Sequence, residues 1–343
     1  MRQSDPGWFG NDHPALRRAW HPVARADEAM GSEPVPIELL GERLVLVRLD
    51  GEVVVLPDRC PHRLAPLSAG VVVGGGAGGG EELRCAYHGY RFDGTGHCTA
   101  IPALGDGATI PPRAHLTPVR SRIHQGMVWV ALDEPLTDLL DVDEHDDASF
   151  VRVTLDPADW TAGAAQMVDN FLDVAHFPFT HLGTFGDPDD TVVEDYQVRR
   201  TAEGWGFEVE HRHLAKALSG SGELIHRIQA FTYRAPLTVL LRITYVEEEV
   251  TLTIAFHHQP LGPGRTRLWV TDYRNDIDES AIPDARAFQQ AVGNEDRALL
   301  ERFHLKAIPL APTGEVHTRA DRITLELRRV LGAFVANADE VTA

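Results

Sequence analysis

The sequence is poor in cysteine, since its 343 residues include only Cys60, Cys85 and Cys98. So few thiols exclude a disulfide-stabilised scaffold and are typical of a protein from a reducing compartment. Long apolar runs are missing as well, because none approaches the ~20 residues of a membrane-spanning helix. The N-terminal residues also lack the charged-then-apolar pattern of an export signal. We therefore expect a cytoplasmic protein with no membrane span.

Positive charge is scarce too. The chain has 32 Lys and Arg residues against 51 Asp and Glu residues, which gives a formal net charge of −19 at pH 7. Such a chain is repelled by nucleic acids and by anionic membrane surfaces, so neither is expected as a partner. Its length is sufficient for two domains, each with a core of its own.

Two of the three cysteines stand close to a histidine. Cys60 and His62 form a C-x-H pair, and Cys85 and His88 form a C-x-x-H pair. Two thiolates and two imidazoles suit a [2Fe–2S] cluster in which one iron takes both sulfurs and the other both nitrogens. The alternative is a structural zinc site, but zinc fingers place two cysteines together and two histidines together. Cys98 is left over, and we expect it to be a small buried side chain.

The pattern of strands and helices predicts an α+β protein. Strands begin near Glu38 and include a hairpin with Asp50-Gly51 as its two-residue turn. A flexible, glycine-rich insertion is predicted at residues 71–82. An acidic segment at 137–147 ends this all-β region, and residues 191–275 alternate in the manner of one large antiparallel sheet. Helices are predicted from 164 to Pro178, from Pro283 to about Lys306, and from Thr318 to Val335.

These signals predict three parts of the chain. An N-terminal segment, residues 1–35, is expected to pack on the C-terminal domain. Residues 36–140 are expected to form an all-β domain that carries the Cys and His pairs. Residues 141–343 are expected to form a second domain around the large antiparallel sheet.

A second group of metal-ligand residues lies in the segment DNFLDVAHFPFTH. Asp173 and His176 are one helical turn apart, and the break at Pro178 allows His181 to fold back toward them. Two imidazoles and one carboxylate, with open positions left for O2 and substrate, form the facial triad of non-haem Fe(II) oxygenases. Taken alone, H-x4-H is a weak signal, and two core or surface histidines would explain it better. Beside an electron-storing cluster, an iron site is the better interpretation.

The carboxylate ligand is left open by the spacing. The helix predicted after Pro283 carries both Glu295 and Asp296, which flank its apolar face. That face is predicted to consist of Phe288, Val292, Leu299, Leu300 and Phe303. Two solvated boundary residues would fit the pattern as well. The histidines at 211, 213, 257 and 258 alternate along strands, and we expect them at the surface.

Taken together, these motifs resemble the α-subunits of Rieske non-haem iron oxygenases, in particular the homo-oligomeric branch that contains the vanillate and dicamba O-demethylases. The resemblance covers nearly the whole chain, through CPHR–APLS–G, C-YHG–FDG–G-C, N-x-x-D-x-x-H-x4-H and the C-terminal helix. It implies an N-terminal all-β Rieske domain and a helix-grip-like catalytic domain with a large antiparallel sheet. Tyr90 departs from the family pattern, which usually has Trp there.

The resemblance also implies roles for the residues of the second group. The positions that match His176, His181 and Asp296 bind the mononuclear iron in that family. The position that matches Asp173 links His176 to His88 of the partner subunit, which implies a homotrimer. Asn170 matches a residue beside the iron that does not bind it tightly.

The implied activity is that of an oxygenase component. Such an enzyme uses O2, and electrons from a separate NAD(P)H-dependent flavin and iron–sulfur reductase, directly or through a ferredoxin. It hydroxylates or oxidatively N- or O-demethylates a small aromatic or heterocyclic compound. The chain itself has no glycine-rich dinucleotide motif after a strand.

Two alternatives remain. One is the α-subunit of a cis-dihydroxylating dioxygenase. The other, of a different class, is a Rieske electron carrier, which would leave His176, His181 and Asp296 without a purpose. Three irons per chain would indicate the oxygenase, and two would indicate the carrier.

Overall fold

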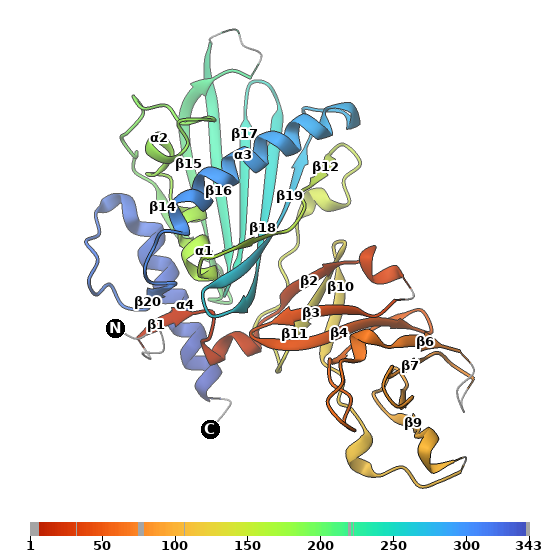
Figure 1. Ribbon diagram of the computed structural model, residues 1–343. Coiled ribbons are helices and arrows are strands. Elements are labelled where there is room, and N and C mark those ends of the chain that lie inside the picture. The colour runs from red at the N-terminus through yellow and green to blue at the C-terminus, as the bar shows by residue number, and fades with distance from the viewer. Residues whose placement is uncertain are drawn as a thin grey trace. The chain divides into compact units, whose positions relative to one another are not determined.

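The computed structural model describes residues 7–31, 33–74, 79–105, 107–218, 221 and 223–340 (Figure 1). The chain forms two compact units, Arg17–Pro135 and Leu136–Ala343, and the segment up to Leu16 belongs to the second. The predicted limits at residues 35 and 140 stay predictions; strand β2, which precedes residue 35, pairs within the first unit. Residues 75–78 of the predicted glycine-rich insertion lie outside the described residues.

The unit Arg17–Pro135 is built from short antiparallel strands. Sheet order is β10-β11-β2, β3-β4-β5 and β6-β7-β8-β9. The predicted hairpin is confirmed, because β4 and β5 are joined by Asp50 (φ 52°) and Gly51 (φ 88°), both in the left-handed region that such a turn requires. The strands are β2 (His21–Arg25), β3 (Val35–Leu39), β4 (Glu42–Leu49), β5 (Glu52–Pro57), β6 (Val71–Val73), β7 (Glu82–Arg84), β8 (Arg91–Phe92), β9 (Cys98–Ala100), β10 (Arg120–His124) and β11 (Met127–Ala131).

The second unit contains the large antiparallel sheet that the alternation predicts. Its strand order is β12-β19-β18-β17-β16-β15-β14, and β13 also pairs with β19. A small separate pair joins β1 (Trp8–Gly10) to β20 (Ala307–Pro309). The strands of the large sheet are β12 (Val151–Thr154), β13 (Ala158–Trp160), β14 (Gln197–Arg200), β15 (Gly206–Lys216), β16 (Leu224–Arg234), β17 (Thr238–Tyr245), β18 (Val250–Gly262) and β19 (Arg265–Arg274).

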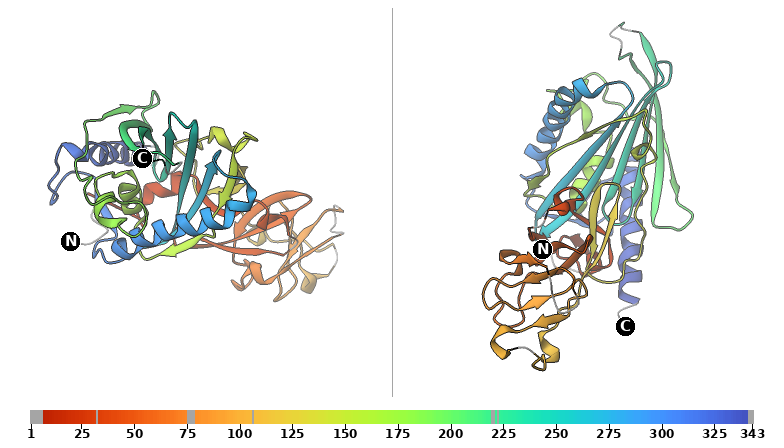
Figure 2. Two further views of the ribbon diagram at one scale, coloured as in Figure 1. Left: turned by 90° about the horizontal axis from the view of Figure 1, so that it is seen from above. Right: turned by 90° about the vertical axis from the view of Figure 1, so that its right-hand side faces the viewer.

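Four helices accompany this sheet among the described residues: α1 (Ala164–Leu172), α2 (Phe177–Thr180), α3 (Ile282–Leu300) and α4 (Arg322–Glu340). In Figure 1, α3 crosses in front of the sheet, and the right-hand view of Figure 2 shows it on one side of the strands. Helix α1 packs on the sheet through Phe171, whose ring centroid lies 4.6 Å from that of Phe256 on β18. No helix within the described ranges combines the length and the apolar character needed to cross a bilayer.

The prediction of one helix from residue 164 to Pro178 is wrong. Helix α1 ends at Leu172, and the backbone of Asp173 is already extended (φ −84°, ψ 134°). The Asp173 carboxylate accepts a hydrogen bond from Ala175 N (2.9 Å), a local alternative to helix that aspartate favours. Pro178 lies in the first turn of α2, where its missing N–H costs no hydrogen bond.

The predicted apolar face of the helix after Pro283 is wrong in part. Phe288, Leu299 and Phe303 are about half-exposed, whereas Leu300 is buried as predicted. The buried positions of α3 are Ala285, Gln289, Asp296 and Leu300. Apart from Leu300, helix α3 therefore turns small and polar side chains inward, which leaves room for a polar site beneath it.

Helix α4 is fixed to α1 by a buried arginine. Arg328, only 2% exposed, pairs with Asp169 (3.1 Å) and with Glu315 (2.9 Å). Thr324 also donates a hydrogen bond to Asp169 (2.8 Å). Because Asp169 adjoins Asn170 on α1, this contact stabilises the helix that leads into the second group of metal-ligand residues.

Candidate metal centres

The two Cys and His pairs lie in loops with the same backbone pattern. In each loop the Cys carbonyl accepts a hydrogen bond from the residue four positions later, Leu64 (2.8 Å) or Gly89 (3.1 Å). Both of these residues have positive φ, 58° and 73°. The Cys N–H in turn donates to a carbonyl five positions later, at Ala65 or Tyr90 (2.8 Å each). The loops are therefore matched hairpin turns that place two equivalent ligand pairs.

The four side chains divide by exposure. Cys60 and Cys85 are buried free thiols, whereas His62 and His88 are exposed, with ring centroids 4.4 Å apart. Burial, together with the neighbouring Cys85, raises the pKa of the Cys60 thiol to about 11. Two inward sulfurs and two outward nitrogens are the donor set of a [2Fe–2S] cluster with one thiolate-bound and one imidazole-bound iron.

Two further residues of this unit, Tyr90 and Cys98, lie near the Cys and His pairs. Tyr90, which replaces the usual Trp, stacks on the His62 ring at 4.8 Å with an interplanar angle of 8°. It therefore keeps an aromatic surface beside that ligand. Cys98 is fully buried in the apolar core of this unit, as predicted, and burial raises its pKa.

The second group converges on three donor atoms, from the N-cap residue and the C-cap residue of α2 and from α3. Nε2 of His176 lies 3.2 Å from Nε2 of His181, and Asp296 Oδ1 lies 3.4 Å and 3.5 Å from these two nitrogens. Two ligands at right angles, each roughly 2.1 Å from a metal, would be about 3 Å apart. The triangle therefore has the size of one face of an octahedral metal site.

The electrostatics of this triangle also favour a cation. Nδ1 of His176 faces the Asp173 carboxylate (3.2 Å), and Nδ1 of His181 faces Glu295 (3.0 Å). With the ring protons held on Nδ1, both Nε2 lone pairs point at each other and at a carboxylate. Burial lowers the pKa of His176, but the carboxylates of Asp173 and Asp296 outweigh it and raise that pKa to about 9, so without a metal this ring also carries a proton on Nε2, which a metal ion would replace. A positive ion at this point relieves the same negative potential.

Each predicted residue of this group is found around the triangle. Asn170 Nδ2 donates to Asp296 Oδ1 (3.0 Å), so it holds the carboxylate from the side of α1. Of the two acids left open by the sequence, Asp296 belongs to the group that could hold a metal. Sequence reasoning missed the contact of Glu295 with His181. Its only signal was the position of Glu295 beside Asp296 in the chain.

Glu295 is itself firmly held. Its carboxylate accepts hydrogen bonds from Gly183 N (2.9 Å) and Thr184 Oγ1 (2.7 Å) besides facing His181. Burial raises the pKa of Glu295, but the hydrogen bonds from Thr184 and His181 keep it below its usual range. A Cβ at Gly183 would lie 2.5 Å from Glu295 Oε1, so only glycine leaves room for this contact.

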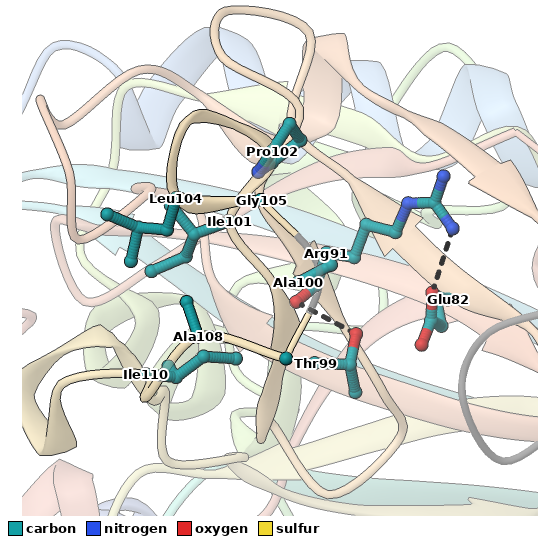
Figure 3. A pocket seen from close by; sticks show the side chains of 11 residues that line it. Glu82, Arg91, Thr99, Ala100, Ile101, Pro102, Leu104, Gly105, Ala108 and Ile110 are labelled. Atoms are coloured by element: carbon teal, nitrogen blue, oxygen red, sulfur yellow. Dashed lines mark hydrogen bonds and ion pairs between the residues drawn. The ribbon is translucent and has the colours of Figure 1, made fainter.

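A cavity of about 690 Å³ adjoins this centre. None of its lining residues comes from helix α3. The expected surface position of the strand histidines is wrong in part, because His211 and His213 line this cavity and His258 is buried. A second cavity of about 550 Å³ lies in the other unit, where Arg91 reaches toward Glu82 at 3.6 Å (Figure 3). It contains none of the Cys or His pairs.

Comparisons with known proteins agree with both centres. Residues 19–113 match the family described as "Rieske [2Fe-2S] domain", and residues 160–337 match "Vanillate O-demethylase oxygenase C-terminal domain". Methylxanthine N3-demethylase NdmB from Pseudomonas putida is 31% identical over 329 residues, which cover 93% of this chain and 89% of that protein.

Solved structures give the same result for the fold. Pseudomonas putida NdmA with caffeine superimposes with a TM-score of 0.83 at 25% identity, covering 96% of this chain and 94% of that one. Dicamba monooxygenase bound to dicamba, at 22% identity, has a TM-score of 0.75 over 94% of this chain and 99% of that one. At that identity, the second likeness concerns the fold alone.

Proposed function

Because this chain belongs to the Rieske non-haem iron oxygenases, with a catalytic domain of the vanillate O-demethylase type, we propose that it oxidatively N- or O-demethylates a small aromatic or heterocyclic compound. The observation that carries the proposal is the triangle formed by His176, His181 and Asp296, with donor separations of 3.2–3.5 Å. An electron carrier has no use for such a site. The names of its relatives, methylxanthine demethylases among them, support demethylation in particular.

The proposed ligands follow from the donor sets. Cys60, His62, Cys85 and His88 would hold the [2Fe–2S] cluster, and His176, His181 and Asp296 would hold the mononuclear Fe(II). When bound, the cluster supplies a one-electron store and the Fe(II) supplies the position at which O2 is reduced.

The protein side chains fix this site in place. Asp173 and Glu295 each hold a proton on the Nδ1 atom of a histidine, which fixes the tautomer and aims Nε2 at the metal. Asn170 donates to Asp296 Oδ1 and leaves its remaining lone pairs for the metal. Because only three protein donors converge on it, a bound metal would keep positions open for substrate and O2.

The proposed demethylation consumes only O2, two electrons and two protons besides the substrate. One oxygen atom of O2 enters a C–H bond of the N- or O-methyl group. The resulting hydroxymethyl group leaves as formaldehyde, and the heteroatom regains a proton. The other oxygen atom leaves as water, with two electrons and two protons that a reductase and the solvent provide.

The proposed partners are a separate NAD(P)H-dependent reductase and further copies of this chain in the cytoplasm. The exposed imidazoles of His62 and His88 offer the reductase a short path to the cluster. Several apolar side chains close to the iron site in sequence are exposed, which supports burial against another subunit. They are Phe179, Leu182, Phe185, Leu299 and Phe303. In the proposed homotrimer, Asp173 would link His176 to His88 of the partner subunit.

A direct test is turnover of the reconstituted enzyme. The chain with cluster and iron is combined with a generic NADH-dependent reductase and a panel of methoxylated and N-methylated aromatic compounds. Substrate-dependent formaldehyde, matched to O2 and NADH consumption, is the expected result. A cis-diol product without formaldehyde would instead indicate the dihydroxylating alternative.

The Asp173→Asn variant tests the link between the two centres. We expect normal iron content and a large loss of turnover. Normal iron content together with normal turnover would refute the bridging role of Asp173.

A further inference from the structure

The cavity of about 690 Å³ is lined by the sequence neighbours of a proposed iron ligand. Ala175 and Phe177, which flank His176 in the chain, both line it. Phe185 also lines it, and its ring stacks on His181 with centroids 4.7 Å apart. A molecule in this cavity therefore reaches the side chains that enclose the proposed iron.

The opposite wall is formed by two neighbouring strands. His211 and His213 on β15 are paired directly with Gln229 and Arg227 on β16, so all four side chains face the same side of the sheet. The two imidazole rings stack with centroids 4.8 Å apart. This wall, His211, His213, Arg227 and Gln229, carries mainly hydrogen-bond donors, whereas Phe177 and Phe185 provide an apolar surface.

Arg227 is the unusual member of the wall. Its Nε donates to His213 Nε2 (2.7 Å), and its guanidinium lies 6.0 Å from the centre of the Tyr245 ring. No carboxylate of the described residues is within ion-pair distance of it, although acidic residues outnumber basic ones by 51 to 32. Its two terminal nitrogens therefore remain available to an anion, and a guanidinium binds a carboxylate best with two parallel hydrogen bonds.

His213 also has a ring nitrogen that is free for a partner. His213 accepts from Arg227 at Nε2, so the neutral ring carries its proton on Nδ1, and this buried Nδ1 has no partner in the described chain. Burial, with Arg227 and His211, lowers the pKa of His213 to about 4, so it stays neutral at physiological pH. Gln229 is only 5% exposed and adds an amide at the same depth.

Acidic residues of the cavity do not cancel this arrangement. Asp187, Asp190 and Glu194 also line it, and the charges of Glu194 and Asp190 act on His211, but all three side chains are exposed. Water and salt screen exposed charges, whereas the half-buried Arg227 acts through a lower effective dielectric. The deeper wall therefore sets the preference for a bound group.

We propose that the substrate is a carboxylate, and that Arg227, held by His213, binds its acid group while Phe177 and Phe185 contact the ring. This inference rests on the proposed function and narrows its substrate to small aromatic or heterocyclic acids. The acid group lies against the sheet, and the methyl-bearing end is directed toward the iron ligands.

The test compares matched probes by calorimetric titration of the oxidised holoenzyme without reductase. The probes are benzoate, 3-methoxybenzoate and 4-methoxybenzoate, each against its neutral nitro isostere. We expect at least one acid to bind roughly tenfold or more tightly than its isostere, because charge-assisted hydrogen bonds are the stronger ones. Arg227→Met should remove that difference, and Arg227→Lys should restore part of it.

Arg212→Met is the matched control. Arg212 lies between the two histidines on β15, but its side chain is 67% exposed and pairs with Glu210. This substitution removes the same charge from the neighbouring strand, and it should leave the affinity of the acids unchanged. Equal binding of acid and isostere, no binding of any acid, or an unchanged affinity in Arg227→Met would overturn the proposal.

The outcome is separable from that of the proposed function. If acids bind in a way that depends on Arg227 but no bound acid yields formaldehyde, the carboxylate site is supported and demethylation is refuted. Formaldehyde from neutral substrates at equal rates in wild type and Arg227→Met would support demethylation and refute the carboxylate site.

Discussion

Glu295 Oε2 lies 3.0 Å from Nδ1 of His181, on the far side of the imidazole from the Nε2 atom that faces His176 and Asp296. Two successive acids of α3 therefore lie at the proposed metal centre in different ways. Asp296 would supply an oxygen to the metal, and Glu295 fixes the ring of His181, another proposed ligand. Hydrogen-bonded partners of this kind orient a ligand and raise its basicity.

Glu295→Gln should weaken iron binding at the mononuclear site roughly 10- to 100-fold, because the amide no longer holds the proton on Nδ1 by charge. The measurement is competition between the protein and a chromogenic Fe(II) chelator. Asp284→Asn, an exposed acid in the first turn of the same helix, is the control and should leave iron affinity unchanged. Wild-type affinity in Glu295→Gln would contradict the orienting role.

Gly183→Ala should also weaken iron binding, although less than Glu295→Gln does, because it displaces the Glu295 carboxylate rather than replacing it. The new Cβ would lie 2.5 Å from Glu295 Oε1, so the carboxylate must move away from His181. Chelator competition again reports the change. Iron affinity equal to that of the wild type would mean that Glu295 can shift without disturbing the ring.

Asp296→Asn should remove the mononuclear iron and spare the cluster. The amide is a poor ligand for Fe(II), whereas the Cys and His pairs lie in the other unit of the chain. The measured iron content should therefore fall from three atoms to two per chain. The content of acid-labile sulfide and the visible absorbance of the cluster should stay unchanged. Three irons per chain in the variant would exclude Asp296 as a ligand.

Arg328→Met should lower the free energy of unfolding by about 2–4 kcal/mol, because it leaves Asp169 and Glu315 without their buried partner. Urea denaturation followed by circular dichroism measures the loss. Arg329→Met is the control, since that side chain is 65% exposed and its pair with Glu326 should be worth less than about 1 kcal/mol. Equal effects of the two substitutions would argue against a special role for the buried contact.

Asp272→Asn should change how stability depends on pH. Burial raises the pKa of Asp272 to about 7, and its Oδ1 has no hydrogen-bond partner. The folded state therefore keeps a proton that the unfolded state releases, so this group costs stability as pH rises from about 4 to 7, on the order of 4 kcal/mol in all. The asparagine variant should gain stability over wild type at pH 8 and little at pH 4. A difference that does not depend on pH would contradict this account.

Much of the fold follows from short-range patterns in the sequence. The hairpin at Asp50-Gly51 is set by local turn geometry, and the large sheet is set by alternation that each strand carries by itself. The two Cys and His pairs are equally local, because each pair occupies one tight loop. Such features depend on few residues close together, so they can be predicted without knowing the tertiary structure.

Most of the features that could not be predicted depend on tertiary contacts. The exception is the early end of α1, which reflects a local hydrogen bond from Ala175 N to Asp173 that leaves no periodic signal in the sequence. The inward face of α3 is mainly polar because it borders the candidate metal site. The contact between Glu295 and His181 joins residues 114 positions apart. The role of His211 and His213 in the cavity likewise depends on how β15 pairs with β16, which places His213 opposite Arg227.

Thr184 belongs to both sites described above, since it lines the cavity and donates a hydrogen bond to Glu295. An incoming molecule that displaces this hydroxyl also disturbs the carboxylate that steadies the His181 ring. Binding of a molecule in the cavity would thus affect the proposed metal ligand His181 through the single side chain of Thr184. Reduction of O2 without bound substrate wastes electrons, so the reaction would benefit from a connection this short between the cavity and the proposed iron site.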